Sequence, residues 1–379
     1  MMIAAILKET TLGENRVAAT PKTVKELIKS GLTVRIQSEA GKASFYSDQD
    51  YIDAGAEVIS DISSLYNNVN IVLKVAPATI AEIESFPNGT AYVSLMQTTR
   101  QSQQVQKLTE KNITGFSMHL IPRTSLAQSM DALSSQANIA GYKSVLMGAT
   151  HLPVYMPLLM TAAGTIPPAK VLILGAGVAG LQAIATAKRL GAQVEAFDVR
   201  PEVKEQVESL GAKFVEVASD SDDGVGEGGY AKETSDDYKQ RQQALIKEHI
   251  AKSNLVITTA LIPGRPAPLL IPTDMVNGMK PGSVIMDLAA ENGGNCELTQ
   301  GDEIVNHNGV IIDGTINLPS TMPAHASQLY AKNVSTFVTY MMKEGKLNLD
   351  LEDEIISGAM FTHEGKITHE PTREAVSNS

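Results

Sequence analysis

Short apolar runs alternate along this chain with stretches in which apolar residues recur at helical spacing. In the first third of the chain the runs that are typical of strands are IAAILKE, TVRIQS, IVLKV and GTAYVSL. Residues 21–30 predict a helix that ends near Gly31, and residues 53–58 predict a second, short one. Because such alternation is typical of a parallel sheet covered by helices, we expect an α/β domain here.

The most informative local pattern is KVLILGAGVAGLQAIATAKRLGAQVEAFDVR, over residues 170–200. An apolar strand leads into a turn with three glycines, followed by a helix, a second apolar strand and an acid. In a dinucleotide-binding βαβ unit the first glycine makes the tight turn, the second lets the backbone approach the pyrophosphate, and the third lets the helix pack on the strand. Gly175, Gly177 and Gly180 hold these positions, so the phosphates would lie at the positive end of the helix.

Asp198 ends the second strand of this unit, where a carboxylate accepts hydrogen bonds from an adenosine ribose and repels a ribose phosphate. The pattern therefore predicts NAD(H) rather than NADP(H). Arg200 can serve a 2′-phosphate, but beside Asp198 we expect it to flank the adenine. A glycine-rich turn without any cofactor is the alternative, and it is disfavoured because strand, turn, helix, strand and acid all occur in order.

The domain organisation follows from the remaining pattern. Residues 129–150 predict a long helix that bridges a first domain to a second one, and Pro153 and Pro157 punctuate the connection after it. A helical pattern over residues 327–343 is able to pack back onto the first domain, which makes that domain discontinuous. We expect two Rossmann-like α/β domains with parallel sheets flanking a nucleotide-binding cleft, with these boundaries: 1–137 plus 318–379 for the first domain, and 138–317 for the NAD-binding domain.

Composition narrows the classes of function. Hydrophobic residues make up 43% of the chain, charged residues 19%, and the net charge is −11, which argues against nucleic acid or an anionic membrane surface as the main partner. The single cysteine, Cys296, excludes an intramolecular disulfide and suits a reducing compartment. No apolar stretch is long enough to span a bilayer, and the N-terminus reads as a strand rather than a signal peptide. The histidines and the cysteine show no metal-binding spacing, so we expect no metal.

An unusually polar segment, IPRTSLAQSMDALSSQ, lies at the domain junction over residues 121–136. Arg123, Gln128, Asp131 and Ser134 are able to line one side of the cleft. Because the last three are spaced three residues apart, we expect them to share one face of a helix. Capping of that helix by Ser125 or Ser129 is an equally open interpretation.

Two other polar features keep two interpretations each. The acidic, glycine-rich stretch 219–237 is typical of a solvated surface loop, yet the isolated Tyr230 within it also fits a lid. Asp287 and Glu291, near the end of a predicted strand, are either a catalytic pair or residues that stabilise a loop. The isolated histidines are more typical of structural or solvated positions than of catalytic ones.

Taken together, several blocks resemble the NAD(H)-binding component of proton-translocating nicotinamide nucleotide transhydrogenase. They cover nearly the whole chain: PRTSLAQSMDALSSQANIAGY, MTAAGTIPPAKVLILGAGVAGLQAIATAKRLGA, DVRPEVKEQVESLGAKF, GGYAKE, TTALIPGRPAP and DLAAENGGNC. That family is related to alanine dehydrogenase, which shares the two-domain fold and a KE…ENRVA pattern, present here at residues 8–9 and 14–18.

The resemblance implies a role for individual residues. Those that surround the nicotinamide and its ribose are Arg123, Thr124, Ser125, Gln128, Asp131 and Ser134, with Gln128, Arg123 and Asp131 closest to the reaction. Val178 and the three glycines cover the pyrophosphate, and Asp198, Val199 and Arg200 hold the adenosine. Gly229 and Tyr230 belong to a mobile loop that closes over the nucleotide, and Gln242 and Leu261 are further contacts.

The resemblance also implies an activity and partners. The reaction is hydride transfer, of the Si/Re type, between NADH on this chain and NADP+ on a separate NADP(H)-binding component. It is driven by proton passage through a membrane-embedded proton-channel component. We expect a homodimer that is cytoplasmic and peripheral on the inner membrane through its partner subunits. The chain ends at Ser379 without membrane helices, which fits a version divided among several polypeptides.

Two other functions remain to be weighed. Alanine dehydrogenase is kept open by Arg16 and Lys74, which stand where that enzyme's substrate-binding groups lie. It is disfavoured because residues 94–97 contain no histidine and because Glu291 replaces the relative's aspartate. A non-enzymatic NAD-binding or regulatory module is the third possibility, and the lid-like loop and the polar junction argue against it.

Overall fold

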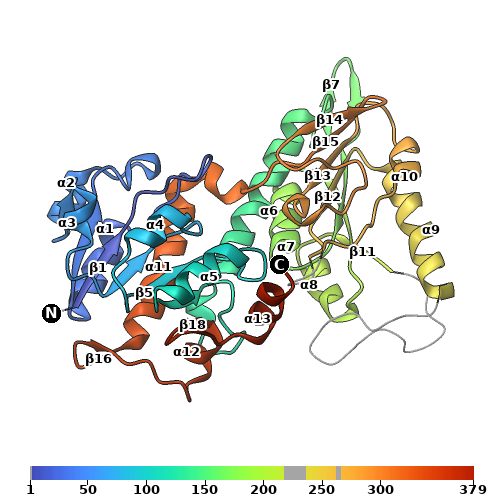
Figure 1. Ribbon diagram of the computed structural model, residues 1–379. Coiled ribbons are helices and arrows are strands. Elements are labelled where there is room, and N and C mark those ends of the chain that lie inside the picture. Colours follow the sequence, from blue (N-terminus) through green and yellow to red (C-terminus); the bar gives the residue numbers. More distant parts are fainter. Residues whose placement is uncertain (1, 217–235, 262–265) are drawn as a thin grey trace. The chain divides into compact units, whose positions relative to one another are not determined.

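The computed structural model describes residues 2–216, 236–261 and 266–379 (Figure 1). The chain divides into two compact units, the first of residues 1–136 and 319–379, the second of residues 137–318. The first unit is therefore discontinuous in sequence. Gly229 and Tyr230, expected in a mobile loop, lie outside the described residues.

In the described residues of unit 1, eight strands form one sheet in the order β19-β18-β6-β5-β4-β1-β2-β3. Six of them are mutually parallel: β1 (Met2–Ile6), β2 (Leu32–Gln37), β3 (Glu57–Ile59), β4 (Ile71–Leu73), β5 (Ala91–Ser94) and β6 (Thr114–Ser117). The C-terminal region of the chain adds the antiparallel strands β18 (Met360–His363) and β19 (Lys366–Ile367). A small separate hairpin pairs β16 (Met342–Lys343) with β17 (Lys346–Leu347).

Helices cover both faces of this sheet, because residues on both faces of its strands are apolar. Ala4 and Ile6 of β1 lie in one core with Phe337, whereas Ala5 and Leu7 lie in the other. The helices of unit 1 are α1 (Pro21–Lys29), α2 (Asp48–Asp53), α3 (Ile62–Leu65), α4 (Ile80–Ser85), α5 (Ser102–Glu110), α11 (Pro323–Met341), α12 (Glu354–Ala359) and α13 (Glu370–Ser377). Short 3₁₀ turns are η1 (Lys42–Ser44) and η2 (Gln128–Met130).

Helix α1 shows how the local sequence sets these elements. Thr20 caps it, and Thr20 and Thr23 form a reciprocal capping box with Pro21 at the first position. Its buried residues include Val24 and Leu27. The helix expected at residues 53–58 is wrong, because α2 ends at Asp53 and β3 begins at Glu57.

Unit 2 contains a second sheet, with the order β11-β10-β9-β12-β13-β15-β14 among the described residues. All neighbours pair in parallel except the edge strand β14. The strands are β9 (Lys170–Leu174), β10 (Gln193–Phe197), β11 (Lys213–Val215), β12 (Leu255–Thr258), β13 (Val284–Asp287), β14 (Ile304–His307) and β15 (Val310–Asp313). After β9 the chain proceeds to β10 and β11 on one side, and then returns to β12 on the other.

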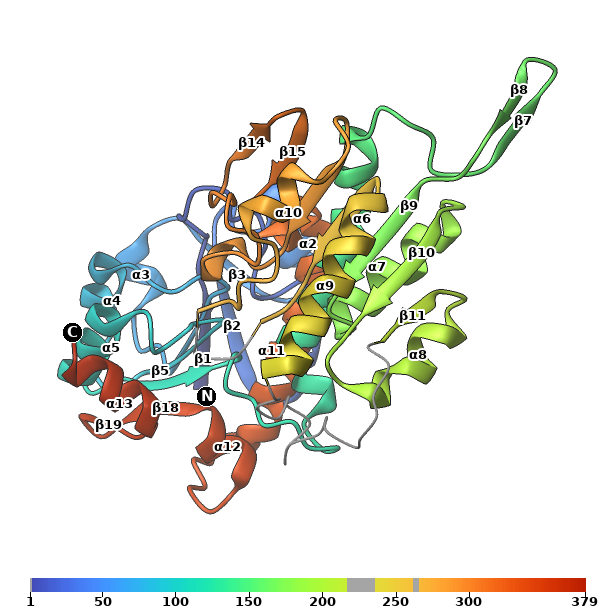
Figure 2. The same cartoon turned by 90° about the vertical axis from the view of Figure 1, so that its right-hand side faces the viewer.

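The helices of unit 2 are α6 (Ala132–His151), which carries the chain in from unit 1, α7 (Val178–Arg189), α8 (Lys204–Ser209), α9 (Asp236–Lys252) and α10 (Thr273–Asn277). Residues of α6, α7 and α8 share one core with Val171 and Ile173 of β9, whereas residues of α9 and α10 share the other with Leu172 and Leu174. Further 3₁₀ turns are η3 (Pro201–Val203), η4 (Ala290–Asn292) and η5 (Leu318–Thr321). A hairpin of β7 (Leu159–Thr161) and β8 (Gly164–Ile166) extends away from the rest of unit 2 (Figure 2).

Candidate nucleotide-binding site

The glycine-rich turn follows β9, at the point where the strand order of unit 2 reverses. In open parallel sheets this switch point, outside the carboxyl ends of the strands, is where ligands bind. Gly175 has a φ of +103°, a conformation that L side chains rarely adopt, and a Cβ there would lie 2.6 Å from the Oγ1 atom of Thr259. The turn can therefore form only with glycine at this position.

Gly180 and Gly177 differ sharply in the space around them. A Cβ on Gly180 would lie 1.9 Å from the carbonyl oxygen of Gly175, so α7 packs on the turn at backbone distance. A Cβ on Gly177 would meet no atom within 4 Å, so open space lies in front of the turn. One glycine is needed for packing, and the other leaves the backbone open to close approach.

The N-terminus of α7 faces the same turn. Gly177 is the N-cap residue, no side chain caps the helix, and the first intrahelical bond runs from the Leu181 N–H to the Gly177 carbonyl over 2.8 Å. The N–H groups of the first turn are thus left for another acceptor. Together with the helix dipole they form a site for an anion such as a phosphate.

Asp198, directly after β10, is bonded to the turn itself. Its Oδ2 atom accepts a 2.7 Å hydrogen bond from the Ala176 N–H, and its Oδ1 atom accepts one of 2.9 Å from the Arg200 N–H. The Arg200 guanidinium adds two more, from Nε to Oδ1 and from Nη2 to Oδ2, each 3.0 Å. Sequence reasoning placed this arginine beside an adenine, and in this structure it forms a two-pronged ion pair with the carboxylate.

Three apolar side chains around this sheet edge are unusually exposed. Val178 after β9, Val199 after β10 and Leu261 after β12 are 41%, 38% and 47% exposed. Because β10, β9 and β12 are neighbours in the sheet, these residues follow the ends of three adjacent strands. An exposed apolar rim beside an anion site suits a ligand with a flat apolar part and phosphates.

The polar junction segment lies in unit 1 and is built differently from the expectation. Gln128 belongs to η2, Asp131 has a non-helical backbone, and α6 begins only at Ala132. The expectation that Gln128, Asp131 and Ser134 share one helical face is therefore wrong. The cap of α6 is Asp131 rather than Ser125 or Ser129, because its carboxylate accepts bonds from the Ser134 N–H (2.8 Å) and the Ser134 hydroxyl (2.6 Å).

The other residues of this segment are available to a ligand to different degrees. Arg123, Ser125 and Gln128 are exposed or partly exposed. The Oγ1 atom of Thr124 is buried and has no hydrogen-bond partner among the described residues, which is uncommon for a buried hydroxyl. Gln242, in α9 of unit 2, is half-buried.

The structure resolves the open interpretation of Asp287 in favour of a loop-stabilising role. This buried carboxylate accepts five hydrogen bonds, from the hydroxyls of Thr258 and Thr299 and from the N–H groups of Ala289, Asn295 and Cys296. Glu291 accepts a bond from the Asn317 N–H. A carboxylate as fully bonded as that of Asp287 stabilises its loop.

Sequence reasoning missed Asn295, which is fully buried next to this loop. Its amide clasps Ala260, accepting a bond from the Ala260 N–H (3.1 Å) and donating one to the Ala260 carbonyl (2.9 Å), and it also donates to the Pro268 carbonyl (2.8 Å). The residue next to Ala260 is Leu261, so Asn295 positions that exposed side chain. The only available signal was an asparagine after two glycines, which is too common to be specific.

Charged residues close the corresponding strand ends of unit 1. Lys74, after β4, is fully buried, and its Nζ atom lies 2.7 Å from Glu82 Oε1 and 3.5 Å from Glu9 Oε2. Burial raises the pKa of Glu9 from 4.5 to about 7, against the opposing effect of Lys74. Nearby, Arg16 Nε and Nη2 donate to the Glu14 carboxylate over 2.8 and 2.6 Å.

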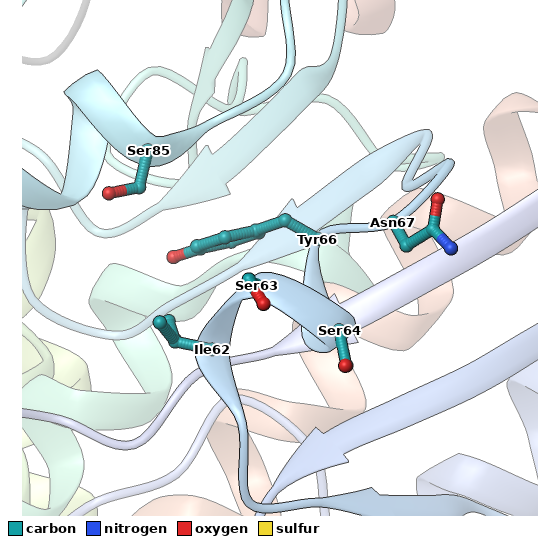
Figure 3. Close-up of a pocket in the computed structure, with 6 residues that line it drawn as sticks. All are labelled: Ile62, Ser63, Ser64, Tyr66, Asn67 and Ser85. Atoms are coloured by element: carbon teal, nitrogen blue, oxygen red, sulfur yellow. The ribbon is translucent and has the colours of Figure 1, made fainter.

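Two hollows in unit 1 contain none of the residues expected to bind nucleotide. The larger, an open depression of about 510 Å³, has these lining residues: Ile62, Ser63, Ser64, Tyr66, Asn67 and Ser85 (Figure 3). A smaller one of about 200 Å³ is lined by the charged groups near Arg16, namely Lys8, Glu9, Glu14, Arg16, Glu39 and Lys42, together with Ala40 and Ala43. No cluster able to hold a metal ion occurs within the described ranges, and no helix there is long and apolar enough to cross a membrane.

Comparison with known proteins gives matches over nearly the full chain. The N-terminal and C-terminal domain families of alanine dehydrogenase/PNT match residues 5–140 and 144–370. An NAD(P) transhydrogenase subunit alpha chain of Rhodospirillum rubrum is 45% identical over 97% of this chain and 98% of its own length. The crystal structure of transhydrogenase from Sinorhizobium meliloti superimposes with a TM-score of 0.87 at 44% identity, covering 96% of this chain and 99% of that one.

An L-alanine dehydrogenase structure also superimposes, with a TM-score of 0.85 at 26% identity, covering 100% of this chain and 99% of that one. The fold class predicted from the sequence, with two Rossmann-like domains, is confirmed by these likenesses and by the two parallel-rich sheets. The resemblance to transhydrogenase is confirmed as well, and alanine dehydrogenase is the more distant relative.

Proposed function

Because this chain belongs to the alanine dehydrogenase/PNT family, we propose that it is the NAD(H)-binding component of a proton-translocating transhydrogenase. The observation that carries the proposal is the full-length likeness to a transhydrogenase alpha subunit, at 45% identity. Hydride passes between NADH on this chain and NADP+ on a separate component, with Si/Re stereochemistry. Proton passage through a membrane-embedded component drives the exchange.

The residues of unit 2 suit the pyrophosphate and adenosine half of the dinucleotide. Open space in front of Gly177 and the uncapped N-terminus of α7 provide room and donors for two phosphates. Val178, Val199 and Leu261 provide apolar surface for the adenosine, and Asp198 is the acceptor for its ribose. Gln242, Gly229 and Tyr230 are proposed as further contacts.

The junction segment of unit 1 suits the nicotinamide half. When bound, the coenzyme itself supplies the hydride, so no acid or base is needed at the reacting carbon. The task left to the protein is to orient the ring and to exclude water. We assign orientation to Gln128, assisted by Arg123 and Asp131, and we assign ribose contacts to Thr124, Ser125 and Ser134. The unpartnered hydroxyl of Thr124 supports this assignment, because a bound group would satisfy it.

A homodimer is supported by the hairpin of β7 and β8. Residues 152–169 contain no charged side chain, although the whole chain carries a net charge of −11. Met160 on this hairpin is 72% exposed, and Leu158 and Tyr155 beside it are more than half exposed. An isolated two-stranded hairpin is marginally stable in water, so it gains from a covering surface. A second copy of this acidic chain meets the least repulsion here, and sedimentation equilibrium tests for the dimer. Through its partner components the dimer would lie on the cytoplasmic side of the inner membrane.

Alanine dehydrogenase is disfavoured by the state of its expected substrate groups. Arg16 already binds the Glu14 carboxylate through two nitrogens, and Lys74 already pairs with Glu82. A carboxylate substrate would have to displace these internal partners from two buried cations. This observation agrees with the absence of a histidine from residues 94–97.

The proposed function is tested by hydride exchange. The purified protein, mixed with NADH and an NADP+-loaded partner component, should transfer hydride, whereas pyruvate and ammonia should not oxidise NADH. Formation of alanine in the second mixture would overturn the proposal.

Gln128→Ala tests the orienting role. We expect it to slow hydride exchange about 10- to 100-fold, since a misplaced ring loses most of the advantage of positioning, while NADH affinity changes little. Ser129→Ala, a neighbour whose side chain has no assigned role in the site, is the control. Equal losses of rate and affinity in Gln128→Ala would contradict the orienting role.

A further inference from the structure

The ion pair between Asp198 and Arg200 uses the whole hydrogen-bonding capacity of the carboxylate. A carboxylate has about four acceptor positions. In the described residues all of them are taken, by the N–H groups of Ala176 and Arg200 and by two nitrogens of the Arg200 side chain. The Asp198 side chain is 6% exposed, whereas that of Arg200 is 32% exposed. A ribose that donates hydrogen bonds to Asp198 therefore has to replace donors that are already present.

The guanidinium is the donor that can leave. The Ala176 N–H is fixed by the glycine-rich turn and the Arg200 N–H is fixed by the backbone next to the carboxylate. The Arg200 side chain, in contrast, is partly exposed and has rotatable bonds, so it can turn away without moving the backbone. A ribose diol, with two hydroxyl donors, matches the two positions that the guanidinium leaves.

The displaced guanidinium stays close to the same ribose, because Arg200 is only two residues from Asp198. A guanidinium is a rigid fork of donors that fits the oxygens of a phosphate as well as those of a carboxylate. The 2′-phosphate that distinguishes NADP(H) from NAD(H) is attached to that ribose. The receptor for the wrong coenzyme is thus already in the site, next to the carboxylate that opposes it.

We infer that Arg200 is a 2′-phosphate receptor that Asp198 keeps out of use, so that the pair determines the preference for NAD(H). In the structure described here the carboxylate holds the guanidinium. With coenzyme bound, its negative charge opposes a 2′-phosphate, and the ribose hydroxyls replace the guanidinium. This inference rests on the proposed function, in which a chain that exchanges hydride with an NADP(H)-carrying partner must itself reject NADP(H).

The test compares two probes that lack the nicotinamide, 5′-AMP and 2′,5′-ADP, together with NADH, by calorimetric titration. Asp198→Asn keeps one acceptor oxygen for the Ala176 N–H but removes the charge. We expect it to bind 2′,5′-ADP about tenfold more tightly than the unmodified protein does, and 5′-AMP no more tightly. Adding Arg200→Gln to this variant should abolish the gain.

The matched control is Asp198→Asn with Arg189→Gln. Arg189 lies in the last turn of α7, at the opposite end of the helix from the glycine-rich turn, so both double variants carry the same net charge. The control should keep the gain in affinity for 2′,5′-ADP. A gain that survives Arg200→Gln, or that Arg189→Gln also abolishes, would overturn the inference, because the effect would then not depend on the guanidinium of Arg200.

Other outcomes separate this inference from the function beneath it. If the unmodified protein binds no NADH, the proposed function fails, whereas NADH binding without a gain in Asp198→Asn defeats the inference alone. Should Asp198→Asn not fold, Arg200→Gln by itself decides: it should weaken 2′,5′-ADP more than 5′-AMP, and equal effects on the two probes would overturn the inference.

Discussion

The two units share one architecture but treat the carboxyl ends of their parallel strands in opposite ways. In unit 2 the strand ends present an uncapped helix terminus, an open space beside Gly177 and exposed apolar side chains. In unit 1 the ends of β1 and β4 are followed by Glu9 and Lys74, which are buried with Glu82 in a cluster of charges. A sheet edge thus becomes a ligand site only where the chain leaves its backbone donors unused and does not supply its own counter-charges.

Lys74→Ala should have the largest effect on this comparison. Removing a buried cation leaves Glu9 and Glu82 without their partner, which typically costs about 3–5 kcal/mol. The control is Lys8→Ala, because the pair between Lys8 and Glu39 is about half exposed and should contribute less than about 1 kcal/mol. The free energy of unfolding of unit 1 can be read from the exchange of its slowest amide hydrogens in β1 and β4. Equal losses in both variants would show that the buried cluster does not stabilise these strand ends.

Gly180→Ala should have the next largest effect, in unit 2. Its new methyl group would lie 1.9 Å from the Gly175 carbonyl oxygen, so the backbone must shift, at a cost of about 1–3 kcal/mol. Gly177→Ala is the matched variant, since its methyl group meets no atom within 4 Å and should cost less than about 1 kcal/mol. We expect only the second variant to lose NADH affinity, at least about tenfold, without losing stability. Unchanged affinity in Gly177→Ala would place the phosphates elsewhere.

Glu9→Gln should have the smallest effect near neutral pH and a clear effect on pH dependence. Burial raises the pKa of Glu9 from 4.5 to about 7, so between these values the folded state holds a proton that the unfolded state has released. The stability that this group contributes to unit 1 should therefore be greatest below pH 4.5, fall as the pH rises through this window, and level off above about 7. Glu9→Gln cannot titrate and should remove this decline. Amide exchange of β1, measured across this window of pH, checks it. A decline that persists in the variant would assign it to another group.

Local sequence signals were sufficient for the fold and for the glycine-rich turn. The central strands are continuous apolar runs, and Gly180 is required by a contact within its own βαβ unit. Periodicity could not identify the start of α6, because Ser125, Ser129 and Asp131 are all good capping residues. Only the bonds from Ser134 distinguish Asp131 among them.

The interactions that the sequence did not reveal join residues far apart in the chain. Lys74 lies in a run that reads as a buried strand, and nothing local indicates that Glu9 and Glu82 neutralise it. The clasp of Asn295 on Ala260 spans 35 residues, and the five bonds to Asp287 come from separate segments of the chain. The pairing of Arg200 with Asp198 is local, but either the carboxylate or an adenine was a reasonable partner for the guanidinium.

The central claim is that the dinucleotide occupies the strand ends of unit 2 while those of unit 1 remain closed by their own charges. Hydrogen–deuterium exchange with and without saturating NADH tests it in one measurement. The amides of residues 176–181 and 198–200 should become protected, and those of residues 8–16 and 74–82 should not change. Protection confined to residues 8–16 and 74–82, or protection in neither unit, would contradict it.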